Sequence, residues 1–254
     1  MNDENKFKIV VLIPCFNEET TIKKVICDFQ KSIPEADIIV FDNNCSDQTA
    51  SIAKKAGAKI IEESRQGKGH VVSSMFEKVE ADYYVLVDGD DTYSAEHVRK
   101  LLKPVIENRA DMTVATRLTE YTEKSFRPLH VFGNNLVKFL VNWIFVNNLT
   151  DIMSGYRAYN KKLVETVPIF STGFEVETEM TIRVLDYGFR IEEVTIPYRE
   201  RPVGSVSKLR TFHDGIRVLK EIARIAKAYK PFTFFGLIGL VFLFAGGISG
   251  VLVL

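Results

Sequence analysis

Short apolar runs recur along the first half of the chain, and polar segments with turn residues separate them. The runs cover residues 8–13, 37–41, 58–61, 83–87 and 111–116. They are nearly continuous rather than alternating, which predicts strands that are buried on both faces of a parallel sheet. Segments with helical spacing lie between the runs and are predicted to begin near residues 19, 46, 70 and 95. This alternation of strand and helix predicts a doubly wound α/β sheet.

The alternation stops after residue 116. Residues 117–130 are polar and have no clear period, which is typical of a loop over a ligand site. Residues 132–149 are rich in large apolar side chains, including Trp143, and fit either a core segment or contact with lipid. We expect core. A helix is predicted around residues 174–179, and a last strand at residues 191–198.

The C-terminal end differs from the rest in composition. Residues 211–230 carry apolar side chains at helical spacing and more cations than acids, which predicts a basic amphipathic helix on a membrane surface. Residues 232–254 contain no charged side chain, which predicts a transmembrane helix. We therefore expect a globular α/β domain at 1–209, a juxtamembrane helix at 210–231 and a transmembrane helix at 232–254, with the natural protein continuing into further spans. The positive charges before the span predict that the α/β domain is cytoplasmic, at the cell membrane.

Charge and cysteine content bear on the class of protein. Lys+Arg and Asp+Glu are each 33, so the formal net charge is zero and the overall balance does not indicate a partner nucleic acid. The polar N-terminus, followed by only a short apolar run, does not fit a secretory signal. The 3 cysteines form no CxxC pair and fit buried thiols in a reducing cytosol. The 4 histidines are scattered and have no metal-ligand spacing.

Three carboxylates, Asp88, Asp90 and Asp91, follow directly after the apolar run at 83–87. Unpaired charge at the end of a buried strand is strongly disfavoured, so a cation is expected there. Gly89 permits a sharp turn that brings Asp88 and Asp90 around one ion, and Mg²⁺ or Mn²⁺ suits such oxygen ligands. The alternative is an acidic N-cap, because a helix is predicted to open just after Asp91.

Acidic and basic residues also follow other predicted strands. Glu18 comes after the first strand and Asp42 after the second. Ligands of doubly wound sheets bind outside the carboxyl ends of the strands, so both acids are expected to share one site with Asp88. The glycine motif of dinucleotide-binding folds is absent after the first strand. Residues 199–208 combine cations, glycine and hydroxyls, which suits a diphosphate but also fits a solvated surface loop.

Several short motifs lie between residues 7 and 210: PCFNE at 14–18, DNNCSD at 42–47, GKG at 67–69, DGD at 88–90, SGY at 154–156, and the basic segment 201–208. In this order and spacing they resemble glycosyltransferase family 2 of the GT-A fold, and more closely its polyprenyl-phosphate sugar synthases, the dolichol-phosphate mannose synthase group. The resemblance implies that Glu18 and Asp42 hold the base and ribose of a nucleotide. It also implies that Asp88 and Asp90 hold the metal. The predicted substrate-binding residues are Pro14, Asn17, Glu18, Asp42, Asn44, Lys68, Asp88, Gly89, Arg127, Ser154, Gly155, Arg201, Ser205 and Lys208, of which Arg201 and Lys208 are expected to bind the phosphates.

Three features depart from patterns within the family. Asn43 stands where an acid is common. Thr92 replaces a glutamine that often serves as a further metal ligand. The Arg/Gln-x-x-Arg-Trp signature of processive members is absent, which favours the transfer of a single sugar.

Together these features predict a membrane-anchored, inverting, metal-dependent hexosyltransferase. It would move one sugar from a UDP- or GDP-sugar to a polyprenyl phosphate, undecaprenyl or dolichyl, because bound cations stabilise the charge of the leaving diphosphate. The predicted catalytic residues are Asp90, Arg117 and Glu177, with Glu175 as the alternative base. A lipid phosphate is already ionised near neutral pH, so it needs orientation more than a base, and Arg117 and Arg127 are expected to orient it.

Two other functions remain as alternatives. One is transfer to a protein or glycan acceptor, with the C-terminal helix as a tether. The other is a catalytically silent scaffold that binds nucleotide sugars in the membrane. Loss of the paired carboxylates would mark a silent scaffold, and both carboxylates are present. The sequence leaves a homo-oligomer open.

Overall fold

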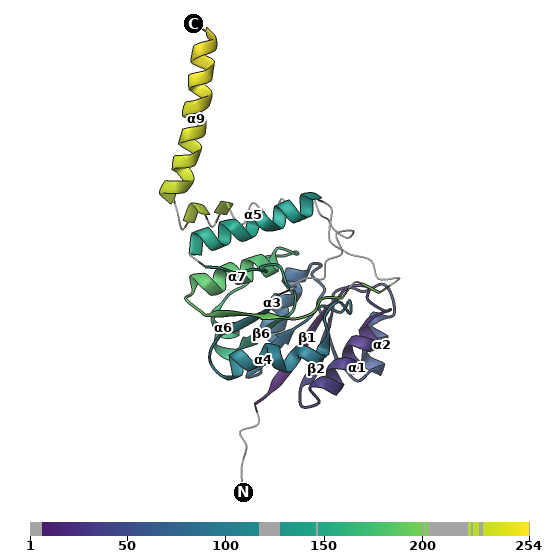
Figure 1. Cartoon of the computed structure of the whole chain (residues 1–254). Helices are drawn as coiled ribbons and strands as arrows, with labels where there is room; N and C mark the ends of the chain where they lie inside the picture. The colour runs from purple at the N-terminus through teal and green to yellow at the C-terminus, as the bar shows by residue number, and fades with distance from the viewer. Residues whose placement is uncertain are drawn as a thin grey trace.

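The computed structural model describes residues 7–116, 128–145, 147–199, 201–202, 223–224, 226–228 and 231–253. These residues form a central sheet with helices on both faces, and a long helix, α9, extends away from this α/β domain (Figure 1). The predicted α/β architecture is confirmed. Most of the amphipathic helix expected at 210–231 lies outside the described residues, so that expectation stays a prediction.

The sheet has seven strands in the order β3-β2-β1-β4-β6-β5-β7. The strands are β1 (Ile9–Cys15), β2 (Asp37–Asp42), β3 (Lys59–Glu62), β4 (Tyr83–Leu86), β5 (Met112–Thr116), β6 (Arg157–Asn160) and β7 (Ile191–Thr195). β1 pairs in parallel with β2 and β4, β2 with β3, and β5 with β7. The apolar runs therefore predicted the mostly parallel sheet correctly. The strand order reverses between β1 and β4, which is where ligands of such sheets bind.

The strand that the apolar pattern missed is β6, which lies antiparallel between β4 and β5. Its sequence, RAYN, contains no apolar run and begins with Arg157. Tyr159 pairs with Tyr84, and Arg157 pairs with Leu86. β6 forms because its two neighbours supply hydrogen bonds and packing, and such tertiary effects override local propensity.

The helices cover both faces of the sheet. They are α1 (Ile22–Ser32), α2 (Thr49–Lys55), α3 (Lys68–Lys78), the 3₁₀ turn η1 (Ala95–His97), α4 (Val98–Ile106), α5 (Pro128–Phe145), α6 (Lys161–Thr166), α7 (Val176–Asp186) and α9 (Pro231–Val253). The helix expected near residue 19 begins at Ile22, and the one expected at residue 70 begins at Lys68. The second shift places Lys68 in the first turn of α3, next to the strand ends.

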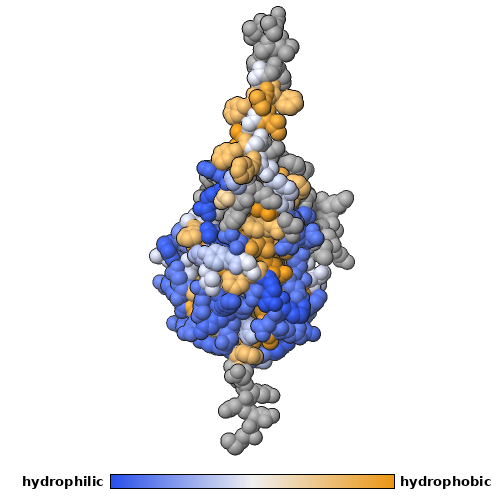
Figure 2. All heavy atoms as spheres, turned by 90° about the vertical axis from the view of Figure 1, so that its left-hand side faces the viewer, coloured by the Kyte–Doolittle hydropathy of each residue, from blue (hydrophilic) through white to orange (hydrophobic). Residues whose placement is uncertain are grey.

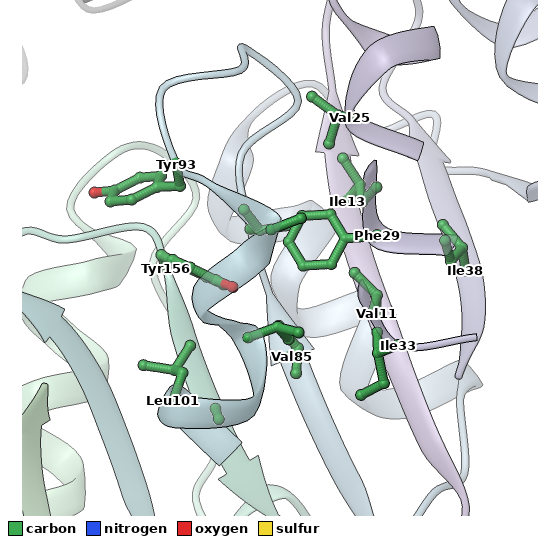
Figure 3. Packing of buried hydrophobic residues seen from close by; sticks show 14 of the residues in the cluster. Val11, Ile13, Val25, Phe29, Ile33, Ile38, Val85, Tyr93, Leu101 and Tyr156 are labelled. Atoms are coloured by element: carbon green, nitrogen blue, oxygen red, sulfur yellow. The ribbon is translucent and has the colours of Figure 1, made fainter. Parts of the chain in front are cut away.

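Two apolar layers enclose the sheet, because successive residues of a strand point to opposite faces. Val11 and Ile13 of β1 pack in one layer with Phe29 of α1, as Figure 3 shows. Val10 and Leu12 pack in the other layer with residues of α3, α6 and α7. Both faces of β1 are therefore buried, which agrees with its continuous apolar run.

Helix α5 buries one side and exposes the other. Val141 and Ile144 pack with Ile182 of α7. Phe139 and Trp143, in contrast, are 64% and 39% exposed. The expectation that residues 132–149 belong to the core is confirmed for the buried side and wrong for Phe139 and Trp143, which lie away from α7 on the same helix.

Helix α9 covers most of the uncharged C-terminal run, so its predicted helical state is confirmed. Its apolar side chains are exposed along the described part of the helix, including Phe232, Val241, Phe242 and Leu243 (Figure 2). Within the residues that the structure describes, no helix is long and apolar enough to cross a membrane. The predicted transmembrane span therefore stays a prediction.

The burial of β1 makes a direct prediction about stability. Leu12 is fully buried in the central strand, so Leu12→Ala should lower the free energy of unfolding by about 2–5 kcal/mol, the usual cost of such a core truncation. The same substitution at Leu240, which is 54% exposed on α9, should change it by less than about 0.5 kcal/mol. Urea denaturation of both variants measures the difference, and equal effects at the two sites would contradict the described core.

Candidate active site

The carboxyl ends of β1, β2 and β4 meet, and they bring acidic residues together as the fold class predicts. Backbone hydrogen bonds join β1 to its neighbours here: residue 43, after β2, donates to Cys15 O, and residue 87, after β4, donates to Leu12 O. Cys15 ends β1 and is buried among these segments. Burial raises the pKa of the Cys15 thiol well above its ordinary value, and the charges of Glu18, Asp42 and Asp88 raise it further. The predicted gathering of three acids at one edge of the sheet is thus observed.

Asp90 is a buried carboxylate with two kinds of support. Arg201 Nη2 lies 2.5 Å from Asp90 Oδ2. Thr92 donates to Asp90 Oδ1 through its backbone N–H, at 3.1 Å, and through its hydroxyl, at 2.6 Å. Burial raises the pKa of Asp90, and the neighbouring charge of Asp88 raises it further, whereas Arg201 and Thr92 act in the opposite direction. Added positive charge would therefore stabilise the ionised form of Asp90, and the hydrogen bonds from Thr92 orient its carboxylate.

Arg201 reaches Asp90 because residues 198 and 199, which precede it closely in the sequence, pair with residues 92 and 93. The backbone N–H of Arg199 donates to Thr92 O at 2.8 Å, and the two segments form an isolated β-bridge. Arg201 Nη1 also lies 3.9 Å from Glu18 Oε1. Arg201, one of the two cations predicted to bind the phosphates, is therefore located between two carboxylates at the strand ends.

Asp88 shares a buried cation with Glu177. Lys68 Nζ lies 2.5 Å from Asp88 Oδ1 and also forms an ion pair with Glu177 Oε1. Burial lowers the pKa of Lys68, but the charges of Asp88 and Glu177 outweigh it and leave the pKa raised. Three residues from α3, the β4 end and α7 thus form one charged cluster, and all three were predicted from the sequence as site residues.

Gly155 and Ser154, from the SGY motif, lie in the turn before β6. A Cβ at residue 155 would stand 2.2 Å from Asp88 Oδ2, so only glycine permits this approach. The hydroxyls of Ser154 and Tyr93 are 3.0 Å apart. Arg157 follows in β6 and is fully buried, with hydrogen bonds to backbone carbonyls of the turn. The sequence analysis missed Arg157, because an arginine after a glycine turn gives no local sign of burial.

The sharp turn after Asp88 is made differently from the prediction. Asp91, not Gly89, adopts the left-handed conformation, with φ of 59°. Gly89 is instead needed for space, because a Cβ there would stand 2.9 Å from Cys15 Sγ. Asp91 accepts a hydrogen bond from Lys24 at 2.8 Å and forms an ion pair with it. The alternative acidic N-cap is wrong, because Ser94 occupies the N-cap of η1.

Asn43 explains one departure from the family pattern. Its side-chain NH₂ donates to Glu63 O and Arg65 O, each at 2.8 Å. Its carbonyl oxygen accepts the backbone N–H of Gly67 at 2.8 Å. A carboxylate at this position has no N–H group to donate to the two carbonyls. The amide of Asn43 therefore holds residues 63–67, the segment that leads into Lys68.

Asn17, Asn44 and Asp42 also hold loops together at this edge. Asn17 Oδ1 accepts the backbone N–H of Ser46 at 2.8 Å, and Asn44 donates to Ser64 O at 2.8 Å. Asp42 Oδ1 accepts the backbone N–H of residue 45 at 2.9 Å. The structure places these residues at the strand ends, and their contact with substrate stays a prediction.

Three glutamates of the segment 175–179 have different surroundings, which sequence alone did not distinguish. Glu179 accepts the backbone N–H of residue 171 at 2.7 Å, and Glu175 accepts that of residue 173 at 3.0 Å. Both therefore hold the loop 170–173. This loop is packed so closely on the GKG motif that a Cβ at Gly67 or Gly69 would overlap its carbonyl oxygens, at 2.1 and 2.0 Å. Glu177 is the glutamate that pairs with Lys68, and the catalytic role expected of Glu177 or Glu175 stays a prediction.

Some predicted site residues make few informative contacts, and others lie outside the described residues. Pro14 lies within β1, opposite Phe41 of β2. Among the described residues, no cluster of three or more histidine, cysteine or acidic side chains has metal-binding geometry. Asp88 and Asp90 are two hard oxygen donors, which fits a cation that completes its shell with water and substrate phosphates. The residues outside the described part are Arg117, Arg127, Ser205 and Lys208.

Comparison with known proteins identifies the family. The sequence model for glycosyl transferase family 2 matches residues 10–167. The chain is 32% identical over 232 residues to glycosyltransferase AglJ of Haloferax volcanii, covering 91% of this chain and 76% of the relative. It is 30% identical over 217 residues to the dolichyl-phosphate hexose transferase of the same organism, covering 85% of this chain and 93% of the relative.

A solved structure supports the fold. Glucosyl-3-phosphoglycerate synthase from Mycobacterium tuberculosis, in complex with Mn²⁺, UDP and glucosyl-3-phosphoglycerate, superposes with a TM-score of 0.69. The alignment covers 88% of this chain and 80% of that one, at 21% identity. At this identity the likeness shows a shared fold, and this fold agrees with the predicted GT-A class.

The bonding of Asn43 predicts that its replacement by an acid is harmful. Asn43→Asp should lower the free energy of unfolding by about 1–3 kcal/mol, because one buried and one partly buried carbonyl lose their donors and face a carboxylate. Asn148→Asp makes the same change at an exposed position and should alter it by less than about 0.5 kcal/mol. Denaturant titration compares the two, and an Asn43→Asp variant as stable as the wild type would refute this assignment.

Proposed function

The chain belongs to glycosyl transferase family 2, and we propose that it moves one hexose from a nucleotide-sugar donor to a polyprenyl phosphate. The observation that carries this proposal is the pair Asp88 and Asp90 at the reversal point of the sheet, with Lys68 and Arg201 against them. A relative with 30% identity over most of both chains is named a dolichyl-phosphate hexose transferase, which supports the lipid phosphate as acceptor.

The donor's diphosphate must be stabilised as it leaves. Asp88 and Asp90 would hold Mg²⁺ or Mn²⁺, and the bound ion would neutralise charge on the leaving diphosphate. Arg201 and Lys68 lie beside the same carboxylates and add positive charge to the place where the phosphates are expected. Asp42 and Glu18 supply acceptors for the base and ribose on the β1–β2 side. UDP and GDP donors both fit this description.

The acceptor side is formed around Glu177. This carboxylate is buried and lies on α7, across Lys68 from Asp88. A lipid phosphate attacks as an ionised nucleophile, because its second pKa is about 6. Glu177 and Lys68 would then orient the reacting groups, with Arg117 and Arg127 proposed for the acceptor phosphate. Direct attack gives inversion at the anomeric carbon.

We also propose that the enzyme works at the cytoplasmic face of the cell membrane. Residues 232–254 carry no charge, and the described side chains of α9 leave large aromatic and aliphatic groups exposed. Such a surface gains free energy from contact with lipid, at roughly 25 cal/mol per Å² of apolar area. A lipid acceptor also requires the catalytic domain to reach the bilayer.

Substitution of the paired carboxylates tests the transfer. Asp88→Asn and Asp90→Asn should each reduce sugar transfer by about 10²-fold or more, because oriented charge at the reacting diphosphate is lost. Asp91→Asn is the matched control, since Asp91 is bound to Lys24 outside the charged cluster, and it should retain activity within about threefold. The assay supplies labelled UDP- or GDP-hexose, undecaprenyl or dolichyl phosphate, and Mg²⁺ or Mn²⁺.

Extraction of the products into organic solvent separates the outcomes of this assay. Labelled sugar in the organic phase supports a lipid acceptor. Label that appears only on protein or glycan would overturn the acceptor, and binding of sugar nucleotide without turnover would support a silent scaffold. Near-normal transfer by Asp88→Asn and Asp90→Asn would remove the proposed role of the carboxylate pair.

Flotation with liposomes tests the membrane proposal. The full chain should float with phosphatidylcholine–phosphatidylglycerol vesicles, and Phe242→Asp should reduce the bound fraction severalfold because a charge enters the apolar surface of α9. Tyr187→Asp changes an exposed aromatic residue at the end of α7 and should float like the wild type. Equal flotation of the two variants would argue against contact between α9 and lipid.

A further inference from the structure

Arg157 is a buried arginine whose hydrogen bonds are directed at one turn of the chain. Its side chain is 0% exposed. Nε donates to Ser154 O at 2.7 Å and Nη2 donates to Ile152 O at 2.6 Å, while Nη1 lies 3.8 Å from Met112 Sδ. Transfer of a guanidinium from water to the protein interior costs free energy, so a buried arginine suggests a specific structural role.

The backbone of Arg157 is fixed independently of this turn. It lies in β6, paired with Leu86 of β4 on one side and with Val114 of β5 on the other. The rigid fork of a guanidinium can bond two carbonyls at once, and here it joins residues 152 and 154 to the sheet. The turn 152–155 is therefore held from the strand that follows it.

Gly155, the last residue of this turn, is in direct contact with Asp88. A Cβ on residue 155 would stand 2.2 Å from Asp88 Oδ2 and 3.2 Å from Lys68 Nζ. Asp88 Oδ1 is held by Lys68 at 2.5 Å. The carboxylate is thus confined between the lysine and the glycine backbone, and a displacement of the turn frees one side of it.

We propose that Arg157 is a positioning residue for Asp88, acting through the turn 152–155 and Gly155. This rests on the proposed function, in which Asp88 is one of two ligands of a divalent cation. Residues that orient metal ligands commonly change metal affinity by about 10–100-fold when they are replaced. Because its side chain is fully buried, Arg157 would not touch the cation or the substrate, so its effect should be confined to binding of the metal and to steps that need it.

Two substitutions separate positioning from packing. Arg157→Met keeps most of the volume and removes both carbonyl bonds, and replacing buried charge with apolar groups is often neutral for stability. Arg157→Lys keeps the charge but cannot bond both carbonyls with one ammonium in the same geometry. Tyr84→Phe, in the neighbouring strand β4, removes a buried hydroxyl that accepts from Ala81 N and donates to Val79 O, away from the charged cluster, and serves as the matched control.

Mn²⁺ affinity of the full chain, measured by electron paramagnetic resonance of free Mn²⁺ in the presence of UDP or GDP, is the main readout. Arg157→Met should weaken Mn²⁺ binding about tenfold or more, Arg157→Lys by a smaller factor, and Tyr84→Phe not at all. Binding of the nucleotide with EDTA present should be the same in all of them. Gly155→Ala should weaken Mn²⁺ binding as well, and the double variant with Arg157→Met should be no weaker than the worse single one, because both act on the same carboxylate.

The outcomes distinguish this inference from the proposed function. Wild-type affinity for Mn²⁺ in a folded Arg157→Met variant would overturn the positioning role and leave the function intact. Additive effects of Arg157→Met and Gly155→Ala would also overturn it, because they would show separate routes to the metal. If Arg157→Met fails to fold, Arg157→Lys and Gly155→Ala carry the same comparison. A wild-type chain that binds no Mn²⁺ and transfers no sugar would overturn both.

Discussion

Two carboxylates at the end of a buried strand need positive charge, and much of the described structure is arranged to supply it. Burial raises the pKa of Asp90, and the neighbouring charge of Asp88 raises it further, because like charges in a partly desolvated place repel strongly. Lys68 pairs with Asp88 and Arg201 with Asp90. These cations come from segments far apart in the sequence, so their pairing requires the loops before α3 and after β7 to converge on one edge of the sheet.

The positions of the strands could be predicted because their physical cause is local. A strand that is apolar on both faces is stable only when helices cover both faces, and β1 is buried in this way. β6 could not be predicted, because its four residues include Arg157 and gain their state from the strands on either side. The same reasoning predicted a common edge for Glu18, Asp42 and Asp88, since parallel strands place their ends together.

Roles within the site were harder to predict, because they depend on which way a side chain points. The sequence pattern shows equivalent carboxylates in Asp88, Asp90 and Asp91, yet Asp91 pairs with Lys24 on α1. It likewise shows several glutamates at the start of α7, yet Glu177 is the one that pairs with Lys68. In the sequence, Asn43 is a departure from a family pattern in which an acid is common. The structure explains why an amide stands there, because its NH₂ group donates to two backbone carbonyls.

Close backbone contact at three glycines confines the charged cluster. Gly67 and Gly69 admit the loop 170–173, and Gly155 admits Asp88, at distances that a Cβ would block. Within this confined place, the acids Asp88 and Asp90 already pair with Lys68 and Arg201. In the proposed function, a divalent cation and an ionised diphosphate would enter together, one facing the carboxylates and the other facing the cations, so that no charged group would be left unpaired in a desolvated site. This matching of charge is an argument that the proposed sugar nucleotide enters with its metal rather than without it.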